Sequence, residues 1–221
     1  QVLPNALAKK LNVKLSTPIK DVSGLSKQYD AVVLATTADA TKKIYQNPTE
    51  PQRGLLDSVH YSSTITLAFR VPLECVKDLA IITVPHIESN VISSYSNEST
   101  KGTIVGDQTL VNVWIWDDYA PELLKKTDEE IFEIVGKELR RVCPPLASAT
   151  ITPHDLQRLP VSMPKYEHGY ITRVAEFWKA GQGDNNVWFC GDYVNAPWVE
   201  GSVRVGQRVA RAIASSASRV L

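Results

Sequence analysis

The chain has 221 residues, 43% of them hydrophobic and 22% charged, which predicts a soluble globular protein with its own hydrophobic core. Its 24 Lys and Arg residues balance its 24 Asp and Glu residues. This balance disfavours a nucleic-acid-binding function, because no excess positive charge attracts phosphates. The three cysteines, Cys75, Cys143 and Cys190, are far apart and form no C-x-x-C pair. They indicate neither a disulfide framework nor a zinc site, and they favour a reducing compartment such as the cytoplasm.

The first part of the chain is expected to hold several short elements. The leucine spacing predicts a helix over residues 4–11, and alternating side chains predict strands at residues 13–15 and 17–22. The apolar run at residues 29–35 is typical of a strand that is buried on both faces. A helix over residues 38–45 should follow that strand.

The middle of the chain reads as an antiparallel meander. Side chains alternate between apolar and polar over residues 61–71, which predicts a long half-buried strand. Further strands are predicted at residues 79–84, 90–94 and 109–116, with a hairpin loop at residues 97–102. Trp114 and Trp116 could line a substrate cavity, although aromatic side chains on a sheet face are more often part of the core or of an interstrand pair.

A capping box marks the clearest helix of the sequence. Thr127 and Glu130 form the Thr-x-x-Glu pattern, and apolar residues at helical spacing then continue the helix over residues 127–142. Three more elements are expected: an extended segment, a buried strand and a long helix, at residues 149–158, 187–190 and 199–218. Helices at both ends and a meander in the middle indicate an α+β fold.

Common catalytic motifs are missing from the sequence. It has no phosphate-binding loop, no G-x-S-x-G nucleophile elbow and no H-E-x-x-H zinc motif. The four histidines are too far apart to form a local ligand pair, so no metal site is predicted. Gly181 and Gly183 lack the third glycine of a dinucleotide fingerprint and are interpreted as a loop.

One constellation near the carboxyl end suits a polar cofactor. The strand at residues 187–190 delivers Gly191 and Asp192 at its carboxyl end, and a glycine-containing helix follows. This order places a carboxylate and unpaired backbone N–H groups at one point. Small residues spaced by four (Gly206, Ala210, Ala214) would let the helix approach a sheet or a ligand closely, and ordinary packing explains them equally well.

These residues resemble a known family. Residues 187–213 are similar to the carboxyl-terminal flavin-binding segment of the FAD-dependent amine oxidase and protoporphyrinogen oxidase superfamily, which includes the phytoene desaturase-like enzymes. The family pattern is an apolar strand, a Gly-Asp-like pair, a loop and Glu-Gly-Ala-Val-x-Ser-Gly-x-x-Ala-Ala. The positions that depart from it are Ser202, Val205 and Val209. Residues 3–7, 29–36, 159–160 and 163–170 resemble other family segments in the same order along the chain.

The resemblance implies FAD as the cofactor and assigns cofactor-binding roles to five residues. Gly191 and Asp192 would contact the ribityl or pyrophosphate part of FAD. Trp198 and Val199 would present backbone groups to the pyrimidine edge of the flavin, and Ile19 would meet the adenine end through its main chain. Reduction places negative charge near flavin N1 and O2, where a helix amino terminus stabilises it. No catalytic residue is assigned.

The resemblance also implies a domain division. Residues 1–45 and 185–221 would supply the closing strand and helix of a Rossmann-like FAD-binding domain, and residues 46–184 a substrate-binding domain with a mixed or antiparallel sheet and flanking helices. The G-x-G-x-x-G unit that begins family members is missing from this sequence. We therefore expect the chain to be the carboxyl-terminal portion of a longer enzyme, with the amino-terminal half of the same protein as its partner.

The expected activity of the full-length enzyme is oxidation of a small-molecule substrate by hydride transfer to the flavin. The substrate is expected to be a large apolar molecule or an amine, and an apolar substrate would fit peripheral contact with a membrane. This portion alone is expected to be inactive and to bind FAD weakly. The alternative is a non-catalytic binding or scaffold domain that keeps the fold without a bound flavin.

Overall fold

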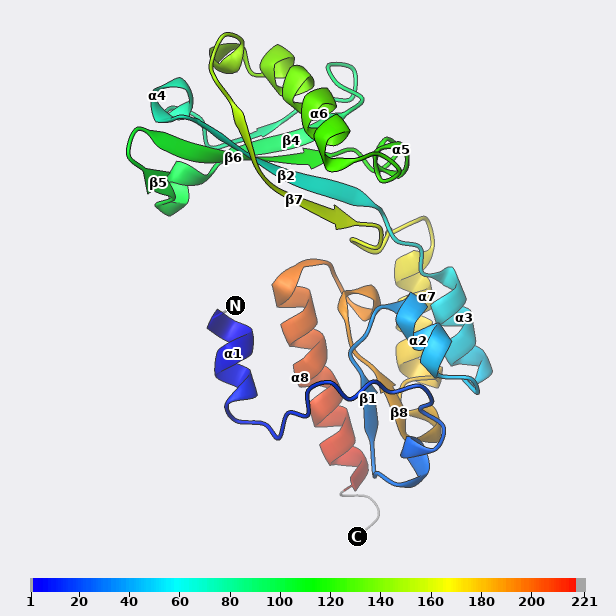
Figure 1. Cartoon of the computed structure of the whole chain (residues 1–221). Helices are drawn as coiled ribbons and strands as arrows, with labels where there is room; N and C mark the ends of the chain where they lie inside the picture. The colour runs from blue at the N-terminus through cyan, green and yellow to red at the C-terminus, as the bar shows by residue number, and fades with distance from the viewer. Residues whose placement is uncertain (1, 218–221) are drawn as a thin grey trace. The chain divides into compact units, whose positions relative to one another are not determined.

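The computed structural model describes residues 2–217 (Figure 1). The chain divides into two compact units, one formed by residues 1–59 with 166–221 and the other by residues 60–165. The sequence places the boundaries after residues 45 and 184 instead. The difference arises because α3 (Glu50–Ser58) and α7 (Tyr170–Ala180) pack against each other within the first unit.

The first unit is built on a pair of parallel strands, β1 (Val32–Leu34) and β8 (Val187–Phe189). Figure 1 shows this pair between α8 (Trp198–Ala217) on one side and α2 (Ala38–Ile44), α3 and α7 on the other. Aromatic rings fill the space between these layers. The ring of Phe189 stacks on that of Phe177 at 5.3 Å and meets the edge of Tyr45 at 6.3 Å. Strand β8 is therefore the buried centre of the first unit.

The amino-terminal segment differs most from the sequence-based expectation. The helix α1 covers Val2–Ala8 rather than residues 4–11, and the strands predicted at residues 13–15 and 17–22 are wrong. The alternating side chains there pair with no neighbouring strand, and nearly all of them are exposed. An alternating pattern forms a strand only where another strand satisfies its backbone.

Strand β1 is shorter and more exposed than predicted. It covers three residues of the predicted residues 29–35, and the side chain of Val33 is 44% exposed. Burial on both faces is therefore wrong for the part of the fold that the structure describes. Among the described residues, the sheet that contains β1 has two strands, so few neighbouring side chains lie beside Val33.

The structure also contains two helices that the sequence analysis missed. Helix α3 begins with a capping box formed by Thr49 and Gln52, with Pro51 in its first turn. Helix α7 begins after Gly169, whose φ of 81° favours glycine, and it buries Val174 and Phe177. Both starts carry recognisable signals, a Thr-x-x-Gln pattern and a glycine before an i, i+4 apolar series.

The second unit contains a six-stranded antiparallel sheet in the order β3-β4-β6-β2-β7, with β5 paired to β6. Its strands are β2 (Thr64–Pro72), β3 (Ile81–Thr83), β4 (Ile92–Asn97), β5 (Ile104–Val105), β6 (Gln108–Ile115) and β7 (Thr152–Leu159). The predicted strands are confirmed, with boundaries shifted by up to three residues. Strands β3, β4 and β6 are antiparallel neighbours as in a meander, whereas in the described structure β2 pairs with β6 and β7 and not with β3. Its helices are α4 (Leu73–Val76), α5 (Ala120–Leu123) and α6 (Asp128–Val142).

One face of this sheet carries the core of the second unit. Helix α6 begins at the predicted capping box and packs its buried side chains, including Ile131, Val135 and Leu139, into the cluster formed by the sheet. Residues of β2 and β6 alternate between this buried face and the opposite face. Trp114 points to the opposite face, where it pairs with Thr66 and is half-buried. Trp114 therefore lies outside the core and forms an interstrand pair, one of the two arrangements expected for an aromatic side chain on a sheet.

The carboxyl-terminal helix follows the prediction closely. It begins one residue earlier than expected, at Trp198, and the structure describes it to Ala217; residue 218, its predicted end, lies outside the described residues. Between residues 2 and 217, no helix combines the length and apolar character that crossing a bilayer requires. The whole is a mixed α/β structure whose larger sheet is antiparallel.

Candidate functional site

Four of the five predicted cofactor-binding residues lie together on one short stretch of the first unit. Gly191 and Asp192 follow β8 directly, and Trp198 and Val199 are the first two residues of α8. Because β1 and β8 are parallel, their carboxyl ends meet at the same edge of the sheet. Ile19 lies in the irregular segment after α1 and is 44% exposed; within residues 2–217 no hydrogen bond joins it to the other four.

Gly191 occupies a position that a larger residue would not fit. Its φ of 159° and ψ of 173° fall in a region that is restricted to glycine. A Cβ atom there would lie 3.0 Å from the ring of Tyr193, and 3.9 Å from the carbonyl oxygen of Thr36 in the loop after β1. The turn therefore keeps backbone close to the carboxyl edge of both strands, with no side chain between them.

Asp192 presents a partly buried carboxylate at this edge. Its Oδ1 accepts a hydrogen bond from the N–H of Tyr193 at 2.8 Å, and its carbonyl oxygen accepts one from the hydroxyl of Tyr166 at 3.0 Å. Burial raises the pKa of the Asp192 carboxyl above its ordinary value, because few charges or donors offset the lost hydration. A ligand that donates hydrogen bonds to this carboxylate would offset that cost.

The loop between Asp192 and α8 is anchored at its base. Tyr193 is fully buried, and the hydroxyl of Tyr170 donates a hydrogen bond to its carbonyl oxygen. The indole N–H of Trp178 donates to the carbonyl oxygen of Val194 at 2.9 Å. These bonds connect the loop to α7, so the side chain of Asp192 is held by a rigid support.

The start of α8 is exposed and strained. Trp198 has a φ of 81°, unusual for a residue with a side chain, and its side chain is 75% exposed. Val199 is 68% exposed. The first N–H groups of a 20-residue helix carry partial positive charge and have no partner within the helix. The site thus offers hydrogen-bond donors beside a large apolar side chain.

Gly201 holds this helix start in place, and the sequence analysis missed its role. A Cβ atom at Gly201 would lie 2.0 Å from the carbonyl oxygen of Ala196. The side-chain amide of Asn195 also donates a hydrogen bond to the carbonyl oxygen of Gly201 at 3.1 Å. The loop therefore crosses the first turn of α8 at a distance that only glycine permits. The available sequence signal was Gly201 itself, a glycine that follows Glu200 within a helical pattern and can indicate close backbone approach.

This arrangement fits a dinucleotide rather than a metal ion. One carboxylate, a glycine turn and a helix amino terminus can contact hydroxyl, phosphate and carbonyl groups of an extended cofactor. Over residues 2–217, no group of three or more His, Cys, Asp or Glu side chains is placed to hold a metal. The residues present therefore fit FAD, which has all three kinds of group.

Comparison with protein families identifies the fold. The model of the flavin containing amine oxidoreductases matches residues 1–214. The chain belongs to this family. The predicted resemblance and the predicted flavin cofactor are thereby confirmed. No curated protein matches the sequence significantly.

Solved structures show the same fold at low sequence identity. A protein assigned as a protoporphyrinogen oxidase from Exiguobacterium sp. 255-15 has a TM-score of 0.67 and 15% identity, over 84% of this chain and 41% of its own. A double mutant of putrescine oxidase has a TM-score of 0.58 and 16% identity, over 84% and 42%. A fatty acid isomerase from P. acnes that produces CLA has a TM-score of 0.55 and 15% identity, over 82% and 41%. The chain thus spans less than half the length of these proteins.

Proposed function

We propose that the chain is the carboxyl-terminal portion of an FAD-dependent oxidoreductase that oxidises an organic substrate by hydride transfer to the flavin. The observation that carries this proposal is the segment from Gly191 to α8, whose geometry suits a dinucleotide in a chain of the flavin containing amine oxidoreductase family. The flavin supplies the redox chemistry when bound. The residues of this chain hold the cofactor, orient the substrate and exclude water.

In this proposal the first unit completes the FAD site. The carboxylate of Asp192 accepts hydrogen bonds from ribityl hydroxyls, and the main chain at Gly191 and Asp192 allows close approach of the pyrophosphate. The backbone groups of Trp198 and Val199 contact the flavin pyrimidine edge, where the amino terminus of α8 stabilises negative charge by about 0.3–1 kcal/mol. The main chain of Ile19 contacts the adenine end.

The second unit supplies the substrate side. Helix α6 covers one face of its sheet. The opposite face, which carries Trp114 and Thr66, is half-exposed. An aromatic ring among short polar side chains can contact an organic molecule of either proposed class, an amine or a large apolar compound. The remaining portion of the FAD site, including the glycine fingerprint, would come from the amino-terminal half of the same protein.

The absorption spectrum of the purified full-length protein tests this proposal. Absorption bands at about 370 and 450 nm are expected if FAD is bound, and the released flavin should stay in the supernatant after the protein is denatured. Asp192→Asn should weaken FAD binding by roughly tenfold, since hydrogen bonds to a charged group contribute about 1.5–3 kcal/mol each. Asp118→Asn, at an exposed carboxylate of the second unit, should leave FAD content unchanged.

A colourless full-length protein that takes up no added FAD would overturn the oxidoreductase proposal. The non-catalytic binding or scaffold domain would then be the better description. Equal loss of FAD in both variants would show that Asp192 has no particular role at the cofactor.

A further inference from the structure

The first unit contains a cavity that the predicted flavin residues do not use. It has a volume of about 330 Å³ and lies between α7, the loop at residues 194–195 and α8. Apolar and polar side chains share its walls: Val174 and Val194 are buried there, and Ile171 is 60% exposed. This volume is at the lower end of the range for small-molecule sites.

The charged side chains at this cavity are both positive. Lys179 of α7 and Arg208 of α8 line it, and no Asp or Glu does. Over the described residues 2–217, neither cation forms an ion pair with an acidic side chain. A cavity lined by two cations and no acidic side chain attracts an anion, and because both side chains are exposed to solvent, the attraction is strongest at low salt.

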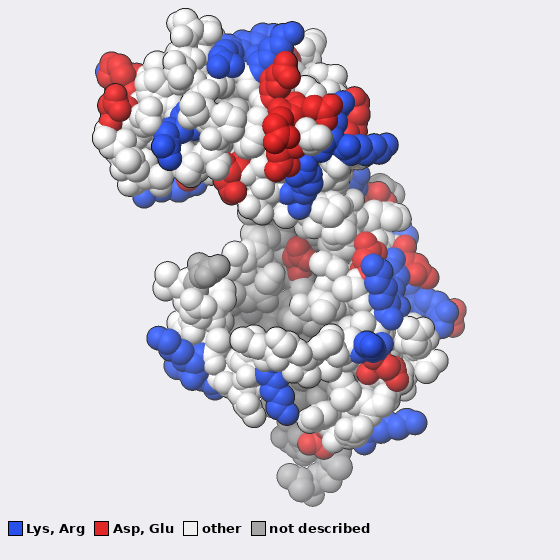
Figure 2. All heavy atoms as spheres, viewed as in Figure 1, with Lys and Arg blue, Asp and Glu red and all other residues white. Residues whose placement is uncertain are grey.

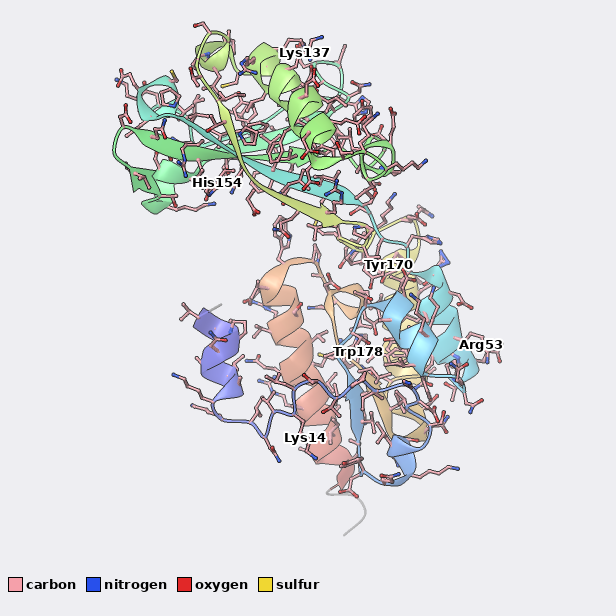
Figure 3. The ribbon with its side chains drawn as sticks, in the orientation of Figure 1. Lys14, Arg53, Lys137, His154, Tyr170 and Trp178 are labelled. Atoms are coloured by element: carbon pink, nitrogen blue, oxygen red, sulfur yellow. The ribbon has the colours of Figure 1, made fainter. Side chains whose placement is uncertain are left out.

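Arg208 is held in one orientation above an aromatic ring. The carbon at the centre of its guanidinium lies 3.6 Å from the ring centroid of Trp178. That ring is fixed in turn, since its N–H donates to the carbonyl oxygen of Val194. Figure 3 labels Trp178 on α7 within the first unit. A guanidinium whose face rests on a ring keeps its N–H donors at its edge, where a planar carboxylate can accept two of them.

We propose that this cavity binds a small organic carboxylate with an aromatic or aliphatic body. The carboxylate pairs with Arg208 and Lys179, and the body contacts Ile171, Val174 and Trp178. A negative charge on an apolar body matches two cations beside apolar side chains, whereas a free phosphate has no apolar body to contact Ile171 and Val174. The site is additional to FAD binding and does not require it.

Calorimetric titration of the 221-residue chain with 3-phenylpropionate, without FAD, tests this site. Saturable binding is expected, and the neutral 3-phenylpropionamide should bind at least about tenfold more weakly, because it cannot form charge-assisted hydrogen bonds. Arg208→Gln and Lys179→Gln should each weaken binding of the acid by about tenfold. Arg211→Gln removes an exposed cation of the same helix outside the cavity and should leave the affinity unchanged.

Further arms keep a folding defect distinct from a binding defect. Far-UV circular dichroism and the unfolding midpoint report whether Arg208→Gln folds, and exposed Lys179 provides a second variant that leaves the ring contact intact. Arg208→Lys keeps the charge but loses the planar fork, and should bind with intermediate affinity. The proposal is overturned if 3-phenylpropionate does not bind, if the amide binds equally well, or if Arg211→Gln weakens binding as much.

A competition arm separates this site from the cofactor site. Added FAD should leave the affinity for 3-phenylpropionate unchanged. Displacement of the acid by FAD would assign the cavity to the cofactor and would overturn the present inference while supporting FAD binding by this chain.

Discussion

Replacement of Gly201 by alanine tests the close crossing at the start of α8. The new Cβ would lie 2.0 Å from the carbonyl oxygen of Ala196 and 2.8 Å from its carbonyl carbon. Carbon–oxygen contacts normally exceed about 3.3 Å, so the loop or the helix must move by more than about 1 Å. Overpacking of this kind costs about 1–3 kcal/mol of unfolding free energy.

Gly206 of the same helix provides a matched control, since a Cβ atom there meets nothing within 4 Å. Alanine is favoured over glycine within helices by about 0.5–1 kcal/mol, and this gain is common to both variants. The difference in unfolding free energy between Gly206→Ala and Gly201→Ala therefore measures the steric cost alone. We expect it to be about 1–3 kcal/mol in favour of Gly206→Ala.

Urea unfolding followed by far-UV circular dichroism measures this difference. Hydrogen exchange of the first turn of α8 should also be faster in Gly201→Ala, because the loop is displaced from the helix. Two variants of equal stability, within about 0.5 kcal/mol, would refute the reasoning about the crossing.

Three further substitutions test other parts of the fold. Gln52→Leu should lower the unfolding free energy of the first unit by about 2–4 kcal/mol in urea. The buried side chain of Gln52 accepts hydrogen bonds from the Tyr45 hydroxyl and the Thr49 N–H, and it donates to two carbonyl oxygens. An unchanged unfolding free energy would contradict that role. Thr127→Ala should lower the unfolding free energy by about 0.5–2 kcal/mol through loss of the α6 cap, and Thr127→Ser should restore most of it. Burial raises the pKa of Asp192, so its charged form opposes folding. Asp192→Asn should be more stable than the parent chain at pH 7, and this gain should shrink as the pH falls towards the unfolded-state pKa of about 3.9 and be absent below it; a gain found only at low pH would contradict the sign.

The electrostatic surface agrees with the charge balance read from the sequence. Figure 2 shows acidic and basic side chains interspersed on the visible face, with red and blue side chains close together on the second unit. The second unit contains ion pairs, such as that of Glu138 with Arg141 at 2.7 Å.

Elements whose information is local were predictable from the sequence. The capping box at Thr127 fixed the start of α6, and period-two alternation located β2 and β6, because one face of each is covered by the core. The strand, Gly-Asp pair and glycine-containing helix near the carboxyl end identified the family segment. Glycine is needed there because the backbone conformation or close approach excludes a side chain, so its position is visible in the sequence.

Other features depended on partners that are distant along the chain. Residues 13–22 alternate like a strand, yet no neighbour pairs with them in the described structure. Helix α3 joins the first unit because the buried side chain of Gln52 bonds to backbone more than 130 residues away. Trp114 faces away from the core because α6 covers only one side of the sheet.

The sequence by itself thus determined composition, the main helices and strands, and the family to which the chain belongs. Only the tertiary structure decided which residues meet at the candidate site. It also showed that the loop packs against α8 at Gly201, and that the guanidinium of Arg208 lies over the ring of Trp178 beside a cavity. The physical reason is that local propensity and periodicity act within a few residues, whereas burial, close backbone approach and paired charges arise when segments far apart in sequence pack together.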